Sequence, residues 1–180
     1  MNKIIIKVNG QDNMIKLGEL LTNFMYPNLV IAMTGDLGAG KTTFTKGVGI
    51  ALGIKRTINS PTFTIMKIYE PTVKLNNIEK LYHLDVYRLS DSSDDDALSE
   101  YFNLDGISIV EWADIISDLL PDTLWHITIA NDGVDSRILT LECDSKTNIN
   151  EIKETLRSNN YEIFYDNFGG LVHICRHCCC

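Results

Sequence analysis

The residues whose types and spacing could do chemistry are concentrated in residues 33–47, which read MTGDLGAGKTTFTKG. Within this stretch GDLGAGKT fits the phosphate-binding pattern G-x-x-x-x-G-K-S/T at every fixed position. Glycines let backbone N–H groups surround an anion, and a helix that begins near Lys41 would add the positive end of its dipole. In such loops the lysine reaches the β- and γ-phosphates of a nucleotide, and the hydroxyl that follows it binds Mg²⁺. The pattern therefore predicts a nucleotide site made by Gly35, Asp36, Leu37, Gly38, Ala39, Gly40, Lys41, Thr42 and Thr43.

Two carboxylates follow apolar runs and are candidates for the metal site that such a loop requires. Asp85 ends the run LYHLD, and Glu111 ends the run ISIVE. A carboxylate at the end of a buried strand is held rigidly, and the run before Glu111 is the more continuously apolar, which favours it as the central strand. Either residue could instead simply cap a strand. Two such carboxylates in one chain with a phosphate loop favour a metal-binding or catalytic role.

Two further segments carry polar side chains that could face the nucleotide. In INSPTFT the hydroxyl of Thr62 could reach the metal or the γ-phosphate, as threonines of switch segments do, and a plain turn is the alternative. In HLDVYR a strand would place His83, Asp85 and Tyr87 on one face, where a lone histidine is more often structural. Trp112, which follows Glu111, could belong to the core or lie over the site.

The elements that must position these residues follow from hydrophobic periodicity and from turn residues. Strands are expected at residues 3–8, 28–33, 62–69, 81–87, 107–110, 124–130 and 138–142. Helices are expected at residues 14–25, 41–52, 94–102, 113–120 and 148–158. The turn NDGVD would join the last two strands. This alternation predicts a single α/β domain over residues 1–144, followed by a C-terminal extension, residues 145–180, of unknown role.

Composition limits the kind of protein this chain can be. It has 180 residues, 44% of them hydrophobic, and a formal net charge of −8. This charge opposes unaided binding to the phosphate backbone of a nucleic acid. Apolar runs are too short for a membrane helix, so we expect a cytoplasmic protein without membrane association. Four of the five cysteines crowd into the last six residues, which favours a reactive tail over a disulfide framework or a zinc site.

Four motifs together, GDLGAGKTTF, SPTFT, HLDVYRL and VEWAD, in this order and spacing, resemble the TsaE (YjeE) family of bacterial ATPases of tRNA threonylcarbamoyladenosine biosynthesis. The similarity runs from about residue 14 to about residue 141. It implies a P-loop NTPase-like sheet flanked by helices, with ATP and Mg²⁺ as cofactors and slow hydrolysis. It also implies a partner complex of the TsaD/TsaB type, which transfers the threonylcarbamoyl group to tRNA, so that tRNA is met only through the partners.

The resemblance also implies roles for single residues. Thr42 and Glu111 would hold Mg²⁺, Asp85 would act near the attacking water, and Trp112 would lie beside the site. Lys41 would be catalytic together with the two carboxylates, and Arg137 matches a position that approaches the nucleotide. The chain departs from the family pattern at Met14, where many members carry a threonine close to the adenine. Residues from Ser145 onward are not part of the pattern.

Three other functions were compared with this ATPase. A small-molecule P-loop kinase usually carries several arginines in a lid, whereas the five arginines here are widely spaced: Arg56, Arg88, Arg137, Arg157 and Arg176. A GTPase would need a guanine-reading Asn-Lys-x-Asp motif, which the sequence lacks. A module that binds ATP without turnover is the remaining class. The sequence favours the partner-dependent ATPase, with the kinase as the alternative.

Overall fold

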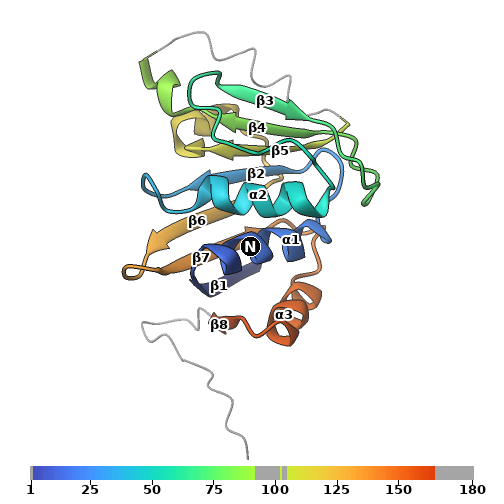
Figure 1. Ribbon diagram of the computed structural model, residues 1–180, viewed down its shortest axis with the longest axis vertical. Helices are drawn as coiled ribbons and strands as arrows, with labels where there is room; N and C mark the ends of the chain where they lie inside the picture. The colour runs from blue at the N-terminus through green and yellow to red at the C-terminus, as the bar shows by residue number, and fades with distance from the viewer. Residues whose placement is uncertain (1, 92–101, 103–104, 165–180) are drawn as a thin grey trace, which may run out of the picture.

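A single mixed sheet of eight strands organises the protein (Figure 1). The computed structural model describes residues 2–91, 102 and 105–164. The strand order is β3-β4-β5-β2-β6-β7-β1-β8, and four adjacent strands, β4, β5, β2 and β6, run parallel. The strands are β1 (Asn2–Asn9), β2 (Val30–Thr34), β3 (Met66–Tyr69), β4 (Leu81–Asp85), β5 (Ile107–Glu111), β6 (Trp125–Asn131), β7 (Ser136–Cys143) and β8 (Glu162–Phe164). The predicted α/β class is confirmed.

Two helices, α1 (Gln11–Thr22) and α2 (Lys41–Ala51), lie together on one face of the sheet (Figure 1). Their backbones approach closely because glycines face each other. A Cβ at Gly18 would lie 2.3 Å from the carbonyl oxygen of Phe44, and a Cβ at Gly47 would lie 1.9 Å from that of Ile15. The main hydrophobic core lies between these helices and the sheet. A second cluster packs on the opposite face against the 3₁₀ segment η3 (Ala113–Leu119).

The parallel strands bring three loops to one edge of the sheet. β2 pairs with β5 so that Met33 lies opposite Glu111, and β4 pairs with β5 so that Asp85 lies opposite Glu111. The carboxyl ends of these strands therefore meet beside the start of α2, where open parallel sheets bind their ligands. This edge receives the glycine loop and both candidate carboxylates.

Several elements differ from the sequence expectation at their ends. α1 begins and ends three residues earlier than expected, after Gly10 with φ 82°. β3 is shorter because residues 61–64 form a turn in which the N–H of Thr64 donates to the carbonyl of Pro61 at 2.8 Å. β4 ends at Asp85, and the chain continues in the 3₁₀ segment η1 (Tyr87–Asp91).

Two further helices were expected, one after Glu111 and one at residues 94–102. The segment after Glu111 forms the 3₁₀ helix η3, which is broken by the non-helical backbone of Ile116, in place of the expected α-helix. The helix expected at residues 94–102 lies almost wholly outside the described residues.

The chain continues the sheet and the core beyond Asp144. Helix α3 (Ile149–Ser158) begins at Asn148, whose side chain accepts from the N–H of Asn150, and it buries Ile152 and Leu156 completely in the main core. β8 then pairs with β1. We therefore propose that the folded unit reaches at least residue 164 and that the expected extension is part of it up to that point. The cysteine-rich tail lies outside the described residues.

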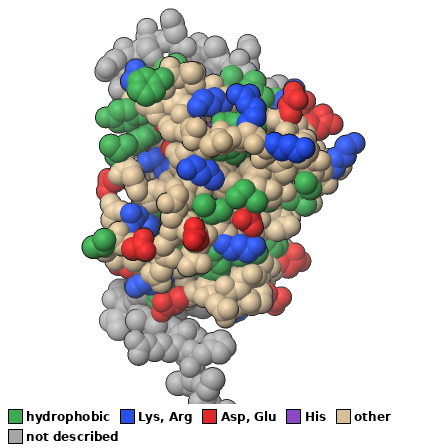
Figure 2. Space-filling model, viewed as in Figure 1, with side chains coloured by type: hydrophobic (Ala, Val, Ile, Leu, Met, Phe, Trp, Pro, Cys, Tyr) green, Lys and Arg blue, Asp and Glu red, His purple; other side chains and the backbone are tan. Residues whose placement is uncertain are grey.

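Charge is unevenly distributed over this acidic protein. Residues 41–88 carry eight Lys and Arg against three Asp and Glu, whereas the rest of the chain carries eight against 21. Figure 2 shows lysine and arginine side chains gathered in the region where Figure 1, in the same view, places β3 and the end of α2. Among the described helices, none is both long and apolar enough to cross a membrane.

The contribution of α3 to stability can be measured with one substitution. Leu156→Ala should lower the free energy of unfolding by about 2–5 kcal/mol, because it leaves a cavity in the main core. Glu154→Ala, on an exposed position of the same helix, should change it by less than about 0.5 kcal/mol. Denaturant unfolding of both variants checks this. Equal stability of Leu156→Ala and the unchanged protein would show that α3 does not contribute to the core.

Candidate functional site

The glycine loop between β2 and α2 adopts a backbone that glycine alone allows at its key positions. Gly35 has φ 136°, and a Cβ there would lie 2.3 Å from the carbonyl oxygen of Ile129. Gly40, at the start of α2, has φ 115° in the left-handed region. The backbone of the loop therefore favours glycine at both positions, and α2 begins directly after Gly40.

Lys41 crosses back over the glycine loop. Its Nζ donates to the carbonyl oxygens of Gly35 at 2.5 Å and Asp36 at 3.0 Å. The same Nζ lies 3.9 Å from the ring centroid of Trp112, which is cation–π geometry. Burial lowers the pKa of Lys41 below its ordinary value, and nearby carboxylates, that of Glu111 first, partly offset this effect. The ammonium group is therefore a desolvated positive charge at the mouth of the loop.

Glu111 is the centre of a buried polar cluster. Its Oε1 accepts a hydrogen bond from the Thr42 hydroxyl at 2.8 Å and lies 2.8 Å from Nε2 of His83. Glu111 and His83 are 4% and 0% exposed, so this contact is shielded from water. The structure thus brings together the two residues expected to hold Mg²⁺, Thr42 and Glu111, and adds a histidine that was expected to be structural.

Asp85 binds the segment that follows α2. Its Oδ2 accepts from the hydroxyls of Ser60 at 2.8 Å and Thr62 at 2.5 Å, and its Oδ1 accepts from the N–H of Tyr87 at 3.2 Å. Asp85 is 2% exposed. The carboxylate therefore holds the turn of residues 61–64 against the end of β4.

Trp112 adopts a backbone conformation that is rare for a bulky residue. Its φ of 62° and ψ of 38° lie in the left-handed region, where a non-glycine residue costs on the order of 1–3 kcal/mol. The indole ring covers the Lys41 ammonium group, and its centroid lies 4.9 Å from that of the Tyr87 ring. Strain at a residue that covers a loop lysine is typical of a functional position.

Two cavities flank the glycine loop. One, of about 260 Å³, is lined by the loop from Leu37 to Thr43 and by Ser60, Thr62, Asp85, Tyr87, Glu111 and Trp112. The other, of about 180 Å³, is lined by part of the same loop and by Gly10, Gln11, Met14, Asp135 and Arg137. Every residue predicted for the site lines one of these cavities, except Gly35 and Asp36, whose carbonyl oxygens bind Lys41.

Arg137 contacts the loop from β7. Its Nε donates to the carbonyl oxygen of Ala39 at 3.2 Å, and a second guanidinium nitrogen donates to the carbonyl oxygen of Ser136 at 2.9 Å. The guanidinium group therefore lies beside the second cavity, near Met14. Met14 presents only apolar atoms to that cavity, where the family resemblance leads one to expect a threonine.

Sequence reasoning missed the parts that Ser60 and His83 play. Each contacts a candidate carboxylate that lies 25 or 28 positions further along the chain. The sequence signal for Ser60 was its place in SPTFT, and that for His83 was its alternation with Asp85 on one face of a strand. Neither signal gives the distance to a carboxylate, which depends on how β4 and β5 pair.

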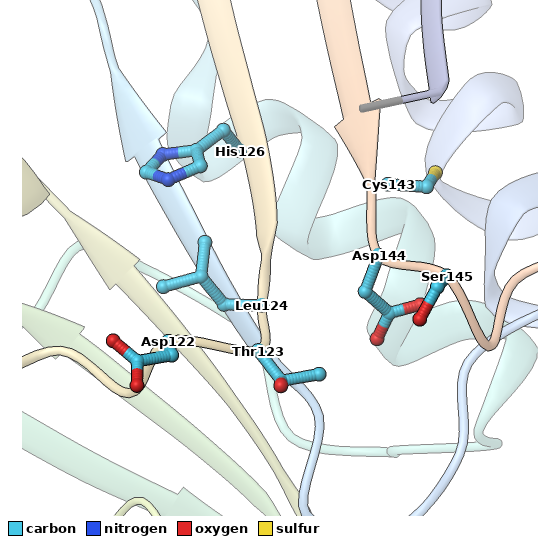
Figure 3. A pocket seen from close by; sticks show the side chains of 7 residues that line it. All are labelled: Asp122, Thr123, Leu124, His126, Cys143, Asp144 and Ser145. Atoms are coloured by element: carbon cyan, nitrogen blue, oxygen red, sulfur yellow. The ribbon is translucent and has the colours of Figure 1, made fainter.

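A larger cavity, of about 420 Å³, lies at the end of the sheet opposite the glycine loop, where β6 begins and β7 ends. Figure 3 shows that the Cys143 thiol, which lines it, points away from His126. Burial raises the pKa of Cys143 to about 12, so the thiol stays protonated at neutral pH. These side chains therefore do not form a reactive cysteine–histidine pair.

Comparison with known proteins identifies the family. The family model described as "Threonylcarbamoyl adenosine biosynthesis protein TsaE" matches residues 8–139. The tRNA threonylcarbamoyladenosine biosynthesis protein TsaE of Bacillus subtilis is 47% identical over 124 residues, which span 69% of this chain and 75% of that protein. That of Rickettsia conorii is 31% identical over 146 residues, spanning 80% and 81%.

The fold leads to the same family. The crystal structure of Bacillus subtilis YdiB superposes with a TM-score of 0.70 and 33% identity, and the match covers 88% of this chain and 97% of that one. The mixed sheet, its flanking helices and the glycine loop form a P-loop NTPase-like fold. The chain therefore belongs to the TsaE family of tRNA threonylcarbamoyladenosine biosynthesis proteins.

Proposed function

We propose that this chain is a Mg²⁺-dependent ATPase that supports threonylcarbamoyladenosine modification of tRNA in the cytoplasm, together with a TsaD/TsaB-type partner complex. Family membership supports the pathway, and the P-loop fold implies nucleotide binding. One observation carries the chemical part of the proposal. Lys41 and Thr42 of the glycine loop line the same cavity as two buried carboxylates, Asp85 and Glu111, which come from neighbouring parallel strands.

The phosphates would bind at the glycine loop. Lys41 already donates to two loop carbonyls, and the charged oxygens of a triphosphate are stronger acceptors than carbonyl oxygens. The backbone N–H groups at the start of α2 would complete the cradle. The base and ribose would lie toward the second cavity, between Met14 and Arg137. Arg137 would then turn from the carbonyl of Ala39 toward the nucleotide.

The side chains of Thr42 and Glu111 carry the type of ligand atom that a magnesium ion prefers. Both offer hard oxygen atoms at the same wall of the cavity. Among the described residues, no group of three or more His, Cys, Asp and Glu could hold a metal by itself. Such a site suits Mg²⁺, which keeps water ligands and shares the phosphates of its nucleotide. When bound, the ion would neutralise charge on the β- and γ-phosphates.

Asp85 would orient the attacking water. Its carboxylate is held by two hydroxyls and one backbone N–H, so its direction is fixed before the nucleotide arrives. The hydroxyl of Thr62 lines the same cavity and would respond to the γ-phosphate. Hydrolysis would therefore change the contacts that hold residues 60–64 to Asp85.

Two exposed apolar side chains, one in the lining of the cavity and one next to a lining residue, support dependence on a partner. Leu37 is 89% exposed, and Phe63, next to Thr62, is 84% exposed. A partner that covered them would exclude water from the phosphates, which strengthens the electrostatic interactions there. For the alternative, a small-molecule kinase, the described part of the chain provides no lid of arginines at the site. Of the described arginines, Arg137 alone lines either cavity.

Removing the loop lysine tests the phosphate site. Lys41→Ala should weaken ATP binding about ten- to hundredfold, because the phosphates lose a charged hydrogen-bond donor. Isothermal calorimetry measures this. Lys46→Ala, on the same helix but outside both cavities, is the matched control and should bind ATP normally. Unchanged ATP affinity in Lys41→Ala would refute the assignment of the phosphate site.

The two carboxylates should differ in their effects. Glu111→Gln should keep the fold and reduce the affinity for Mg²⁺ by about tenfold or more, since it removes the charge that attracts a hard cation. Asp85→Asn should keep that affinity and lose turnover. Calorimetric titration of ATP at several Mg²⁺ concentrations measures the affinity for the metal, and phosphate release at saturating Mg²⁺ measures turnover. The opposite pattern, with Mg²⁺ affinity lost in Asp85→Asn alone, would exchange the two roles.

The isolated chain should bind tRNA no more tightly than about 1 µM at physiological salt, because its net charge of −8 repels a polyanion. It should nevertheless be required for modification when the partner complex and ATP are present. Filter binding and a reconstituted modification assay lacking only this protein measure the two parts. The double variant Lys55→Glu, Arg56→Glu probes the basic segment of residues 41–88. Tight binding that this variant abolishes, or sustained modification without the protein, would contradict the proposal.

A further inference from the structure

His83 has an unusual place beside the candidate metal site. It is fully buried in β4, and its Nε2 lies 2.8 Å from Oε1 of Glu111. Its other ring nitrogen, Nδ1, is buried without a hydrogen-bond partner among the described residues. An unpaired buried polar atom costs on the order of 1–3 kcal/mol. If His83 served packing alone, an apolar residue of similar size would fill the same space without this cost.

The hydrogen bond to Glu111 indicates a role for His83 in orienting that carboxylate. A carboxylate oxygen accepts, so Nε2 must carry the proton and donate to Oε1. The same oxygen accepts from the Thr42 hydroxyl, so Glu111 is held by one donor from the glycine-loop helix and one from β4. Glutamate has three side-chain torsions, and two donors from different elements fix the carboxylate far better than one. The donor from β4 is the more rigid of the two, because His83 is enclosed on all sides.

We infer that His83 is a positioning residue that fixes the Glu111 carboxylate for binding Mg²⁺ with the nucleotide. The inference rests on the proposed function, in which Glu111 is a metal ligand. Groups that orient a ligating side chain typically contribute ten- to hundredfold to metal affinity. Loss of the His83 donor should therefore weaken nucleotide binding only where the metal takes part.

The test compares ATP binding in Mg²⁺ with ATP binding in EDTA by calorimetry, so that it does not depend on turnover. The ratio of the two affinities reports the contribution of the metal. His83→Leu should lower this ratio about tenfold or more and leave the affinity in EDTA unchanged. His83→Gln should restore most of the ratio, because its side-chain amide can donate from close to the position of Nε2. If His83→Leu fails to fold, His83→Asn replaces it, since its shorter amide does not reach Glu111.

Three outcomes would overturn the inference. Both affinities could stay at their wild-type values in His83→Leu. Both affinities could fall by the same factor, which is what a purely structural role predicts. His83→Gln could behave like His83→Leu, in which case donation to Glu111 is not what matters. Glu111→Gln, measured in parallel, separates this failure from a failure of the proposed function. If Glu111→Gln also keeps the wild-type ratio, then Glu111 is not a metal ligand and the proposed site itself is wrong.

Discussion

The hydrogen bond from Thr42 to Glu111 joins the two halves on which the candidate site depends. Thr42 belongs to the first turn of α2, and Glu111 is the last residue of β5. The bond exists because β2 and β5 are parallel neighbours, so that the loop leaving β2 and the carboxylate ending β5 reach the same edge of the sheet. The close packing of α2 on α1, through facing glycines, fixes the height of that first turn above the sheet. A shift of β5 by one residue would turn Glu111 to the opposite face.

Burial of the charged side chains in this site has a cost in free energy. Lys41, Asp85 and Glu111 are at most 5% exposed, and each would be costly if left unpaired. The structure meets the cost with short contacts: loop carbonyls and an indole ring for Lys41, hydroxyls for Asp85, and Thr42 with His83 for Glu111. These contacts hold the charged groups in place before any ligand is bound. A nucleotide would therefore meet two carboxylates that are already oriented, which reduces the free energy spent on ordering them.

Much of the fold could be predicted from the sequence because its signals are local. The glycine motif gave the start of α2, and the apolar runs LYHLD and ISIVE placed both carboxylates at strand ends. What the sequence did not reveal depends on contacts between distant segments. β8 has three residues and exists only because β1 offers an edge for pairing. The break in η3 follows from the backbone of Ile116, which hydrophobic periodicity does not encode. The tasks of Ser60 and His83 likewise depend on where β4 places them.

Contacts around Trp112 connect the candidate phosphate site to the surface. With its left-handed backbone, Trp112 places its indole ring over Lys41 and against the ring of Tyr87. The backbone N–H of Tyr87 donates to the carboxylate of Asp85, two residues earlier in the chain. Asp85 in turn holds Thr62, and Thr62 adjoins the exposed ring of Phe63. A phosphate that drew the Lys41 ammonium away from the indole would remove one of the contacts that hold Trp112 in its strained conformation. In the proposed function, the same chain of contacts would let the nucleotide change the surface that a partner meets, since Lys41 and Thr62 line the same cavity. Phe63 follows Thr62, which lines the cavity. A change at the nucleotide would therefore reach Phe63 without movement of the sheet.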